Sequence, residues 1–157
     1  MSVQIVVGSK SDLEVAKKAA AVLKKLRIAY KISIASAHRT PDKVIELAKS
    51  KDSEIFIAIA GLAAALPGTI AAHTEKPVIG VPVSGKVLLD SILSMVQMPK
   101  GVPVATVGLD AGDNAAILAA EILALSNQKI AESLKKYRHE MREAIDQDNK
   151  ELERSDV

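Results

Sequence analysis

Apolar residues fall into five runs of strand length along the chain. They are VQIVV (residues 3–7), YKISIA (30–35), EIFIAIA (54–60), KPVIGVPV (76–83) and VPVATVG (102–108). The third and fifth runs are nearly continuous rather than alternating, which is typical of a parallel sheet covered on both faces. The apolar pattern therefore predicts a sheet of five strands, the third and fifth of them buried on both faces.

Stretches of helical periodicity lie between these runs. The first carries apolar residues at steps of three and four, with lysines elsewhere: Leu13, Ala16, Ala20, Leu23 and Leu26. Four more stretches follow the later strands, at residues 42–50, 69–74, 88–97 and 114–126. This alternation of strand and helix predicts a doubly wound, three-layer α/β/α domain with a central parallel sheet.

The composition changes from Asn127 onward. This segment is rich in charge, and its apolar residues form a narrow stripe of Ile130, Leu134, Tyr137, Met141 and Ile145. The pattern predicts a long amphipathic C-terminal helix over 127–157, following an α/β core over 1–126. Packing of this helix on its own domain and docking on another subunit both fit the stripe.

Composition narrows the classes of partner. The 157 residues fit one domain, and the absence of cysteine fits a reducing cytoplasm. A net charge of +2 with only 2% aromatic residues argues against nucleic acid and favours a small-molecule ligand. The apolar stretch 55–72 has nearly membrane-spanning length, but Gly61, Pro67 and Gly68 interrupt it, so no membrane segment is expected.

Ligands of open parallel sheets bind beyond the carboxyl ends of the strands, so the loops there carry the candidate chemistry. The first such loop is GSKSD, Gly8 to Asp12. Its serines and the start of the following helix favour an anion, because exposed backbone N–H groups and the helix dipole attract negative charge. A simple helix cap by Ser11 or Asp12 explains the same residues.

The second loop is SAHRTPDK, residues 36–43. Thr40 followed by Pro41 predicts a helix start, which places His38 and Arg39 at the same sheet edge as the first loop. The planar fork of Arg39 suits a phosphate, and an imidazole can pass a proton near neutral pH. A solvated His–Arg pair is the alternative. Two such loops on one edge favour a site.

The third loop, AGLAAALPGT (60–69), is small, apolar and uncharged. Small residues let the backbone approach a ligand closely, although tight packing of helix on sheet accounts for them equally well. His73 and His139 are expected to be surface or packing residues. No spacing of histidines or carboxylates indicates a metal site, and no dinucleotide fingerprint is present.

Taken together and in order, several motifs resemble the PurE family of N5-carboxyaminoimidazole ribonucleotide mutases. They are GSKSD, SAHRTPDK, AGLAAALPG, VPV, VQMPKGVPVATVG and NAAILAAEIL, and they span nearly the whole chain. The resemblance implies a flavodoxin-like fold, a homo-octamer, a ribonucleotide substrate and no metal or organic cofactor. Residues 1–126 become the nucleotide-binding catalytic core, and 127–157 part of the oligomer interface.

The resemblance also assigns roles. It implies that a carboxyl group moves from the exocyclic nitrogen of an aminoimidazole to ring carbon C4, with His38 as the general acid and base. Arg39 and Ser9 are expected to hold the phosphate, with Ser11 as a helper. Asp12 is expected to accept from the ribose hydroxyls, and Ser36 to lie near the imidazole.

Three positions depart from the family pattern. Ala65 stands where the family has a histidine before LPG, Leu62 where many members have glycine, and Leu88-Leu89-Asp90 where Gly-x-Asp is frequent. The third loop is nonetheless closer to the mutase form than to the form of the related carboxylases. The alternatives are carboxylation of aminoimidazole ribonucleotide by free carbon dioxide, and a nucleotide-binding protein with weak or no activity because of Ala65.

Overall fold

A computed structural model describes residues 2–85 and 88–154 of the chain. The predicted core (1–126) begins, and the predicted C-terminal region (127–157) ends, at residues outside this description. The elements, in chain order, are β1 (Ser2–Val7), the 3-10 helix η1 (Lys10–Asp12), α1 (Leu13–Lys25), β2 (Ala29–Ile34), α2 (Pro41–Ala48), β3 (Ile55–Ala60), α3 (Leu66–Ala71), β4 (Val78–Pro82), α4 (Leu88–Val96), β5 (Ala105–Thr106), α5 (Gly112–Ala124) and α6 (Gln128–Arg154).

The five strands form one parallel sheet in the order β2-β1-β3-β4-β5. This is the flavodoxin-like order, and the predicted fold class is confirmed. The strand order reverses between β1 and β3, where the crossovers leave toward opposite faces. Such a switch point opens a crevice at the carboxyl ends of the strands.

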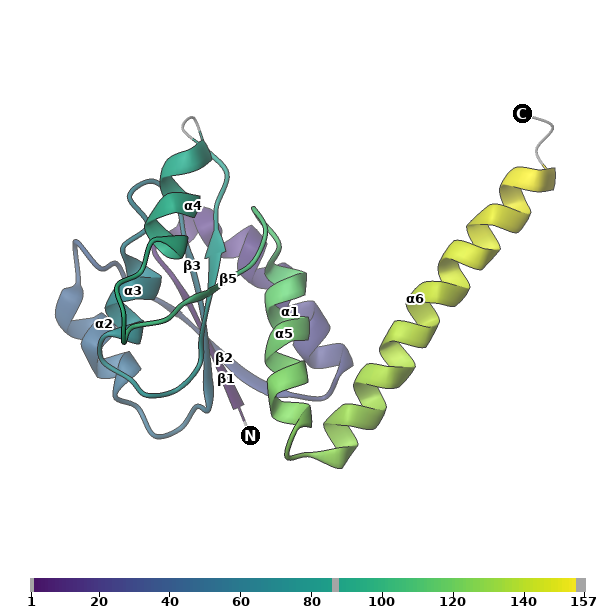
Figure 1. Ribbon diagram of the computed structural model, residues 1–157, viewed down its shortest axis with the longest axis horizontal. Helices are drawn as coiled ribbons and strands as arrows, with labels where there is room; N and C mark the ends of the chain where they lie inside the picture. The colour runs from purple at the N-terminus through teal and green to yellow at the C-terminus, as the bar shows by residue number, and fades with distance from the viewer. Residues whose placement is uncertain (1, 86–87, 155–157) are drawn as a thin grey trace.

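Two apolar layers cover the sheet, one on each face. Helices α2, α3 and α4 lie on one side, and α1 and α5 on the other (Figure 1). Alternate residues of a strand supply the two layers: Ile57 and Ile59 join the α1–α5 side, whereas Phe56 and Ala58 join the other. Both faces of β3 are therefore buried, which explains why its sequence shows no alternation.

Most predicted elements differ from the structure by one or two residues at an end, and two differ by more. The fifth apolar run is reduced to Ala105–Thr106, at the sheet edge beside β4. Pro103 lies in that run, and proline has no N–H to contribute to a strand ladder. Helix α3 begins at Leu66, earlier than the predicted 69, and ends at Ala71. Its Pro67 suits the first turn of a helix, where no N–H is needed.

Helix α6 begins on the body of the molecule and then projects away from it (Figure 1). Ile130 and Leu134 are buried in the same apolar cluster as α1 and α5, and Tyr137 packs against it. Further along, Met141 is 50% and Ile145 61% exposed. The predicted long helix is confirmed, and the body of the molecule covers only the first part of its apolar stripe.

Candidate functional site

The loop after β1 is organised around Asp12, which is only 7% exposed. The Ser9 backbone N–H donates to Asp12 Oδ2 at 3.1 Å, and Ser11 Oγ donates to Asp12 Oδ1 at 2.9 Å. Asp12 is the N-cap residue of α1, but its carboxylate does not bond to that helix. Instead it orders the loop, and its charge lies at the positive end of the helix dipole.

The loop after β2 begins α2 in the predicted way, with Thr40 at the N-cap and Pro41 as the first helical residue. Thr40 Oγ1 accepts from the Ser36 N–H at 2.9 Å and thereby closes the turn. His38 lies within this turn and is exposed. Its imidazole can therefore reach both a ligand and solvent protons.

Arg39 joins the two loops. Its Nη2 donates to the backbone oxygen of Gly8 at 3.1 Å, and its Nε donates to Ser36 Oγ at 3.4 Å. These bonds fix the plane of the guanidinium while leaving further N–H groups of the fork for an anion. The side chain thus brings the GSKSD and SAHRTPDK loops together, as expected from the parallel topology.

The loop after β3 has an unusual backbone. Leu62 and Ala64 have positive φ values of 55° and 38°, a region that residues other than glycine seldom adopt. Leu62 is also 78% exposed. Ala65 is half-buried, and its backbone oxygen accepts from the N–H and the Oγ1 of Thr69, both at 2.9 Å. Strain of this kind concentrates at binding sites and switches.

These loops surround a pocket of about 680 Å³ at the carboxyl edge of the sheet, a size typical of small-molecule sites. The residues predicted to be catalytic or substrate-binding all line it, together with Ala65: Ser9, Ser11, Asp12, Ser36, His38, Arg39 and Ala65. Leu62 lines it as well. The departure at Leu88-Leu89-Asp90 lies in the first turn of α4, and Leu89 and Asp90 are not part of the pocket lining. The pocket therefore combines hydroxyls, a guanidinium, an imidazole and a small apolar wall.

The pocket has a fourth wall, formed by the loop after β4, which the sequence analysis did not predict. Val83, Ser84 and Gly85, which directly follow β4, also line the pocket. The rule that drew attention to the first three loops applies equally to this one, because β4 is parallel to β3. Its sequence VSG has no charge or ring in the described part, so nothing but its position marks it.

The remaining histidines have partners elsewhere. His73 lies in the turn after α3 rather than inside the helix, and its Nδ1 is 2.8 Å from the backbone oxygen of Thr69. His139 pairs with Glu143 on α6 at 3.2 Å. Among the described residues, no three His, Asp or Glu side chains gather as metal ligands would, and no helix has the length and hydrophobicity needed to span a membrane.

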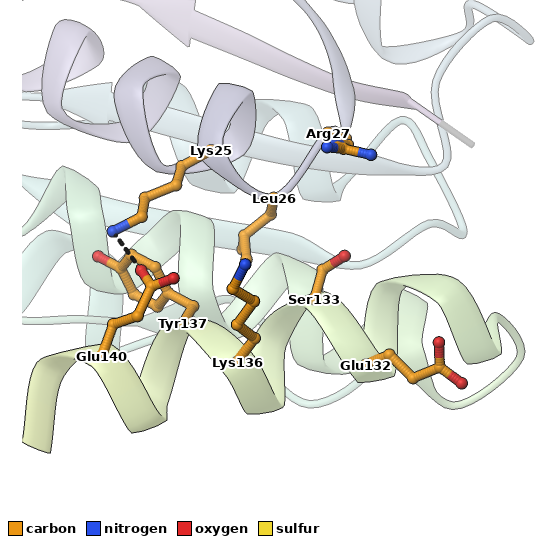
Figure 2. Close-up of a pocket in the computed structure, with 8 residues that line it drawn as sticks. All are labelled: Lys25, Leu26, Arg27, Glu132, Ser133, Lys136, Tyr137 and Glu140. Carbon is orange, nitrogen blue, oxygen red and sulfur yellow. Dashed lines mark ion pairs between the residues drawn. The ribbon is translucent and has the colours of Figure 1, made fainter. Parts of the chain in front are cut away.

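A second hollow, of about 460 Å³, lies between the end of α1 and α6 (Figure 2). Lys25 and Glu140 form an ion pair across it at 2.8 Å, and Lys25 Nζ lies 4.8 Å from the centre of the Tyr137 ring. The hydrogen bond between the two charges raises the pKa of Lys25 and lowers the pKa of Glu140. We interpret these contacts as an anchor of α6 rather than as a catalytic site.

Fold and site together define a flavodoxin-like α/β domain whose sheet edge carries serine hydroxyls, a guanidinium and an exposed histidine in one pocket. The AIR carboxylase family profile matches residues 2–144, and the chain belongs to this family.

Relatives and solved structures extend this match. The chain is 54% identical over 142 residues to the N5-carboxyaminoimidazole ribonucleotide mutase of Methanocaldococcus jannaschii, with 90% of each chain covered. It is 52% identical over 145 residues to the enzyme of the same name from Pyrococcus abyssi, covering 89% of this chain and 83% of that one. The crystal structure of Treponema denticola PurE superposes with a TM-score of 0.86 at 34% identity, covering 96% and 98% of the two chains.

Proposed function

We propose that this protein is an N5-carboxyaminoimidazole ribonucleotide mutase, an isomerase of purine biosynthesis. The observation that carries the proposal is the bond from Arg39 to Gly8, because it places His38 beside the serine-rich loop in one pocket. Membership of the family and the relatives' names support the same reaction.

The reaction is an internal transfer with His38 as the proton carrier. Cleavage of the bond between the exocyclic nitrogen and the carboxyl carbon releases carbon dioxide within the pocket, and protonated His38 gives its proton to that nitrogen. C4 then bonds to the carbon dioxide, and the C4 proton returns to His38. Protons and electrons balance without an oxidant or reductant. The apolar wall formed by residues 61–66 suits confinement of the neutral gas.

The polar side chains of the pocket bind the nucleotide substrate. Arg39, Ser9 and Ser11 hold the phosphate, because a guanidinium fork and hydroxyls complement its oxygens. Asp12 accepts from the ribose hydroxyls with a carboxylate already held at the loop by Ser9 and Ser11. Ser36 lies beside His38 and faces the imidazole of the substrate. No metal or organic cofactor takes part in this scheme.

A turnover assay tests the proposal. The protein is mixed either with the carboxylated nucleotide, or with aminoimidazole ribonucleotide and bicarbonate as the source of carbon dioxide. Faster formation of the C4-carboxylated product from the first substrate is expected. Faster formation from the second makes the protein a carboxylase. Nucleotide binding without either reaction makes it a binding protein that lacks activity.

The proposal extends to assembly and location. Residues 1–126 form the catalytic core, and the region 127–157, which contains α6 (Gln128–Arg154), belongs to the same domain and also serves an interface of a homo-octamer in the cytoplasm. Large apolar side chains are exposed in separate regions, including Ile34 on β2, Leu93 on α4 and Ile145 on α6. A closed octamer needs more than one self-contact surface, which separate apolar regions supply.

A further inference from the structure

The wall of the pocket that follows β4 is held by its backbone. The Val83 N–H donates to the backbone oxygen of Ala60 at 3.0 Å, which continues the pairing of β4 with β3. The next N–H, that of Ser84, has passed the end of the strand. It donates to Asp110 Oδ1 at 3.0 Å, a side chain twenty-six positions further along the chain.

Asp110 also forms a hydrogen bond to Pro82, the last residue of β4. Its own N–H donates to the backbone oxygen of Pro82 at 2.9 Å, and its backbone oxygen accepts from Lys18 Nζ of α1 at 3.2 Å. One residue thus bonds to positions on both sides of Val83. Asp110 itself does not line the pocket, so it can act on a ligand only through the segment that it holds.

The backbone of Asp110 is in the left-handed region, with φ of 55°. Aspartate and asparagine tolerate this region better than other residues with a side chain, but they still adopt it at a cost that the surrounding bonds must offset. A carboxylate that accepts from a backbone N–H makes a stronger bond than a neutral acceptor. The conformation is therefore maintained by the contacts to Pro82 and Ser84.

We infer that Asp110 is a positioning residue that holds Ser84 and Gly85 against the nucleotide, so that substrate affinity depends on it. This inference rests on the proposed function for the identity of the ligand. The reason is geometric: the two residues follow the last ladder bond of β4, and without the Asp110 carboxylate the Ser84 N–H loses its acceptor. A loosened wall must be ordered again when the nucleotide binds, and that ordering weakens binding.

Three variants distinguish the effect of the Ser84–Asp110 hydrogen bond from the effect of the left-handed backbone of Asp110. Asp110→Asn keeps a side-chain acceptor and tolerates positive φ. Asp110→Gly removes the acceptor but relaxes the backbone. Arg27→Gly is the matched control, because Arg27 also has a positive φ, of 58°, in the turn after α1 and outside the pocket.

Binding of the C4-carboxylated product nucleotide is measured by calorimetry, which does not need turnover. We expect Asp110→Gly to raise Kd by about tenfold or more, the scale of one charge-assisted hydrogen bond. Asp110→Asn is expected to stay within about threefold of the parent, and Arg27→Gly to leave Kd unchanged. Parental affinity in Asp110→Gly, or equal losses in the asparagine and glycine variants, overturns the inference.

Hydrogen–deuterium exchange of a peptide covering residues 78–85 supplies the second readout. Faster exchange in Asp110→Gly, but not in Asp110→Asn or Arg27→Gly, is expected from the loss of the Ser84 acceptor. Unchanged exchange in Asp110→Gly overturns the positioning role even if the parent binds no nucleotide. Failure of the parent to bind is, by contrast, a failure of the proposed function, so the two outcomes are distinguishable.

Discussion

His38 has the environment that a proton shuttle requires. It is exposed in a turn that Thr40 closes, and it lies in the wall of the pocket beside Arg39. We expect His38→Asn to lower the turnover number by about a hundredfold or more, because an amide cannot carry the proton between nitrogen and carbon. Nucleotide affinity, measured by calorimetry, is expected to remain. Parental turnover in this variant would move the acid–base role to another residue.

Arg39 is the residue proposed to bind the phosphate of the nucleotide. Arg39→Ala is expected to weaken nucleotide binding by about 1.5–3 kcal/mol, the usual contribution of a charged hydrogen bond. It also removes the bond to Gly8 that joins two loops. Arg142→Ala, on the exposed part of α6, is the matched control for loss of a positive charge. Equal affinities of the two variants in calorimetry remove Arg39 from the binding site.

Ala65 lines the pocket at a position where the resemblance to the PurE family implies a histidine. A methyl group there can neither orient the carboxyl group of the substrate nor hydrogen-bond to it, whereas the residues proposed to bind the nucleotide lie in other loops. We expect slow turnover with normal binding, and a gain of at least about tenfold in Ala65→His, which is about 1.4 kcal/mol of barrier.

Steady-state rates of the parent, Ala65→His and Ala63→His decide the role of position 65. Ala63 lines the same pocket and provides the control for adding an imidazole nearby. Equal, high rates in all three show that the site works without the family histidine. His73 is not expected to compensate, because it lies outside the pocket and its Nδ1 is already at hydrogen-bond distance from the Thr69 backbone oxygen.

At the scale of elements, the packing of α5 on α1 depends on Gly112. A Cβ added at this position would lie 2.2 Å from the backbone oxygen of Val15, a distance that real Cβ contacts essentially never show. Gly112→Ala must therefore push the two helices apart, and we expect it to lower the free energy of unfolding by about 1–3 kcal/mol. Chemical denaturation measures this loss. Gly108→Ala is the control, because its added Cβ would lie 3.7 Å from the Cβ of Ala111, an ordinary van der Waals distance. This variant is expected to change the free energy of unfolding by less than about 0.5 kcal/mol.

At the same scale, several predicted elements were confirmed, and the exceptions have physical causes. The apolar runs located all five strands of the sheet. β3 and β4 are buried throughout, as their nearly continuous apolar sequence indicates, whereas the residues of β2 and β5, at the sheet edges, are exposed or half-buried. The length of the fifth strand was overestimated, because an apolar run does not reveal that its strand lies at the edge of the sheet and pairs with β4 alone. The boundary of α3 was missed because residues 60–69 read equally as a loop or as a helix start.

At the scale of the whole molecule, the exposed apolar residues of α6, Met141 and Ile145, are the feature that favours binding to another subunit. We expect Ile145→Glu to lower the mass of the assembly in light scattering, because a charge on the apolar stripe opposes burial there. Gln147→Glu adds the same charge away from the stripe and is expected to leave the mass unchanged. A parent that is monomeric, or a loss of mass in both variants, contradicts a role of this stripe in assembly.

The local sequence by itself determined the chemistry that the candidate site can offer. GSKSD and SAHRTPDK each carry a helix start and polar side chains within a few residues, and such features depend on local backbone geometry. The parallel topology, predicted from the strand pattern, was enough to place both loops on one edge. On these grounds His38 and Arg39 could be favoured as site residues, whereas the roles of Ser9 and Asp12 were implied by the resemblance to the PurE family.

Only the tertiary structure decided which groups act on one another over long distances. The bond from Arg39 to Gly8 and the bond from Ser84 to Asp110 join segments that no periodicity relates. The left-handed backbone of Leu62 and the division of α6 into a packed and an exposed half are likewise invisible locally. Each depends on where two elements meet in space, and that follows from packing of the whole sheet rather than from neighbouring residues.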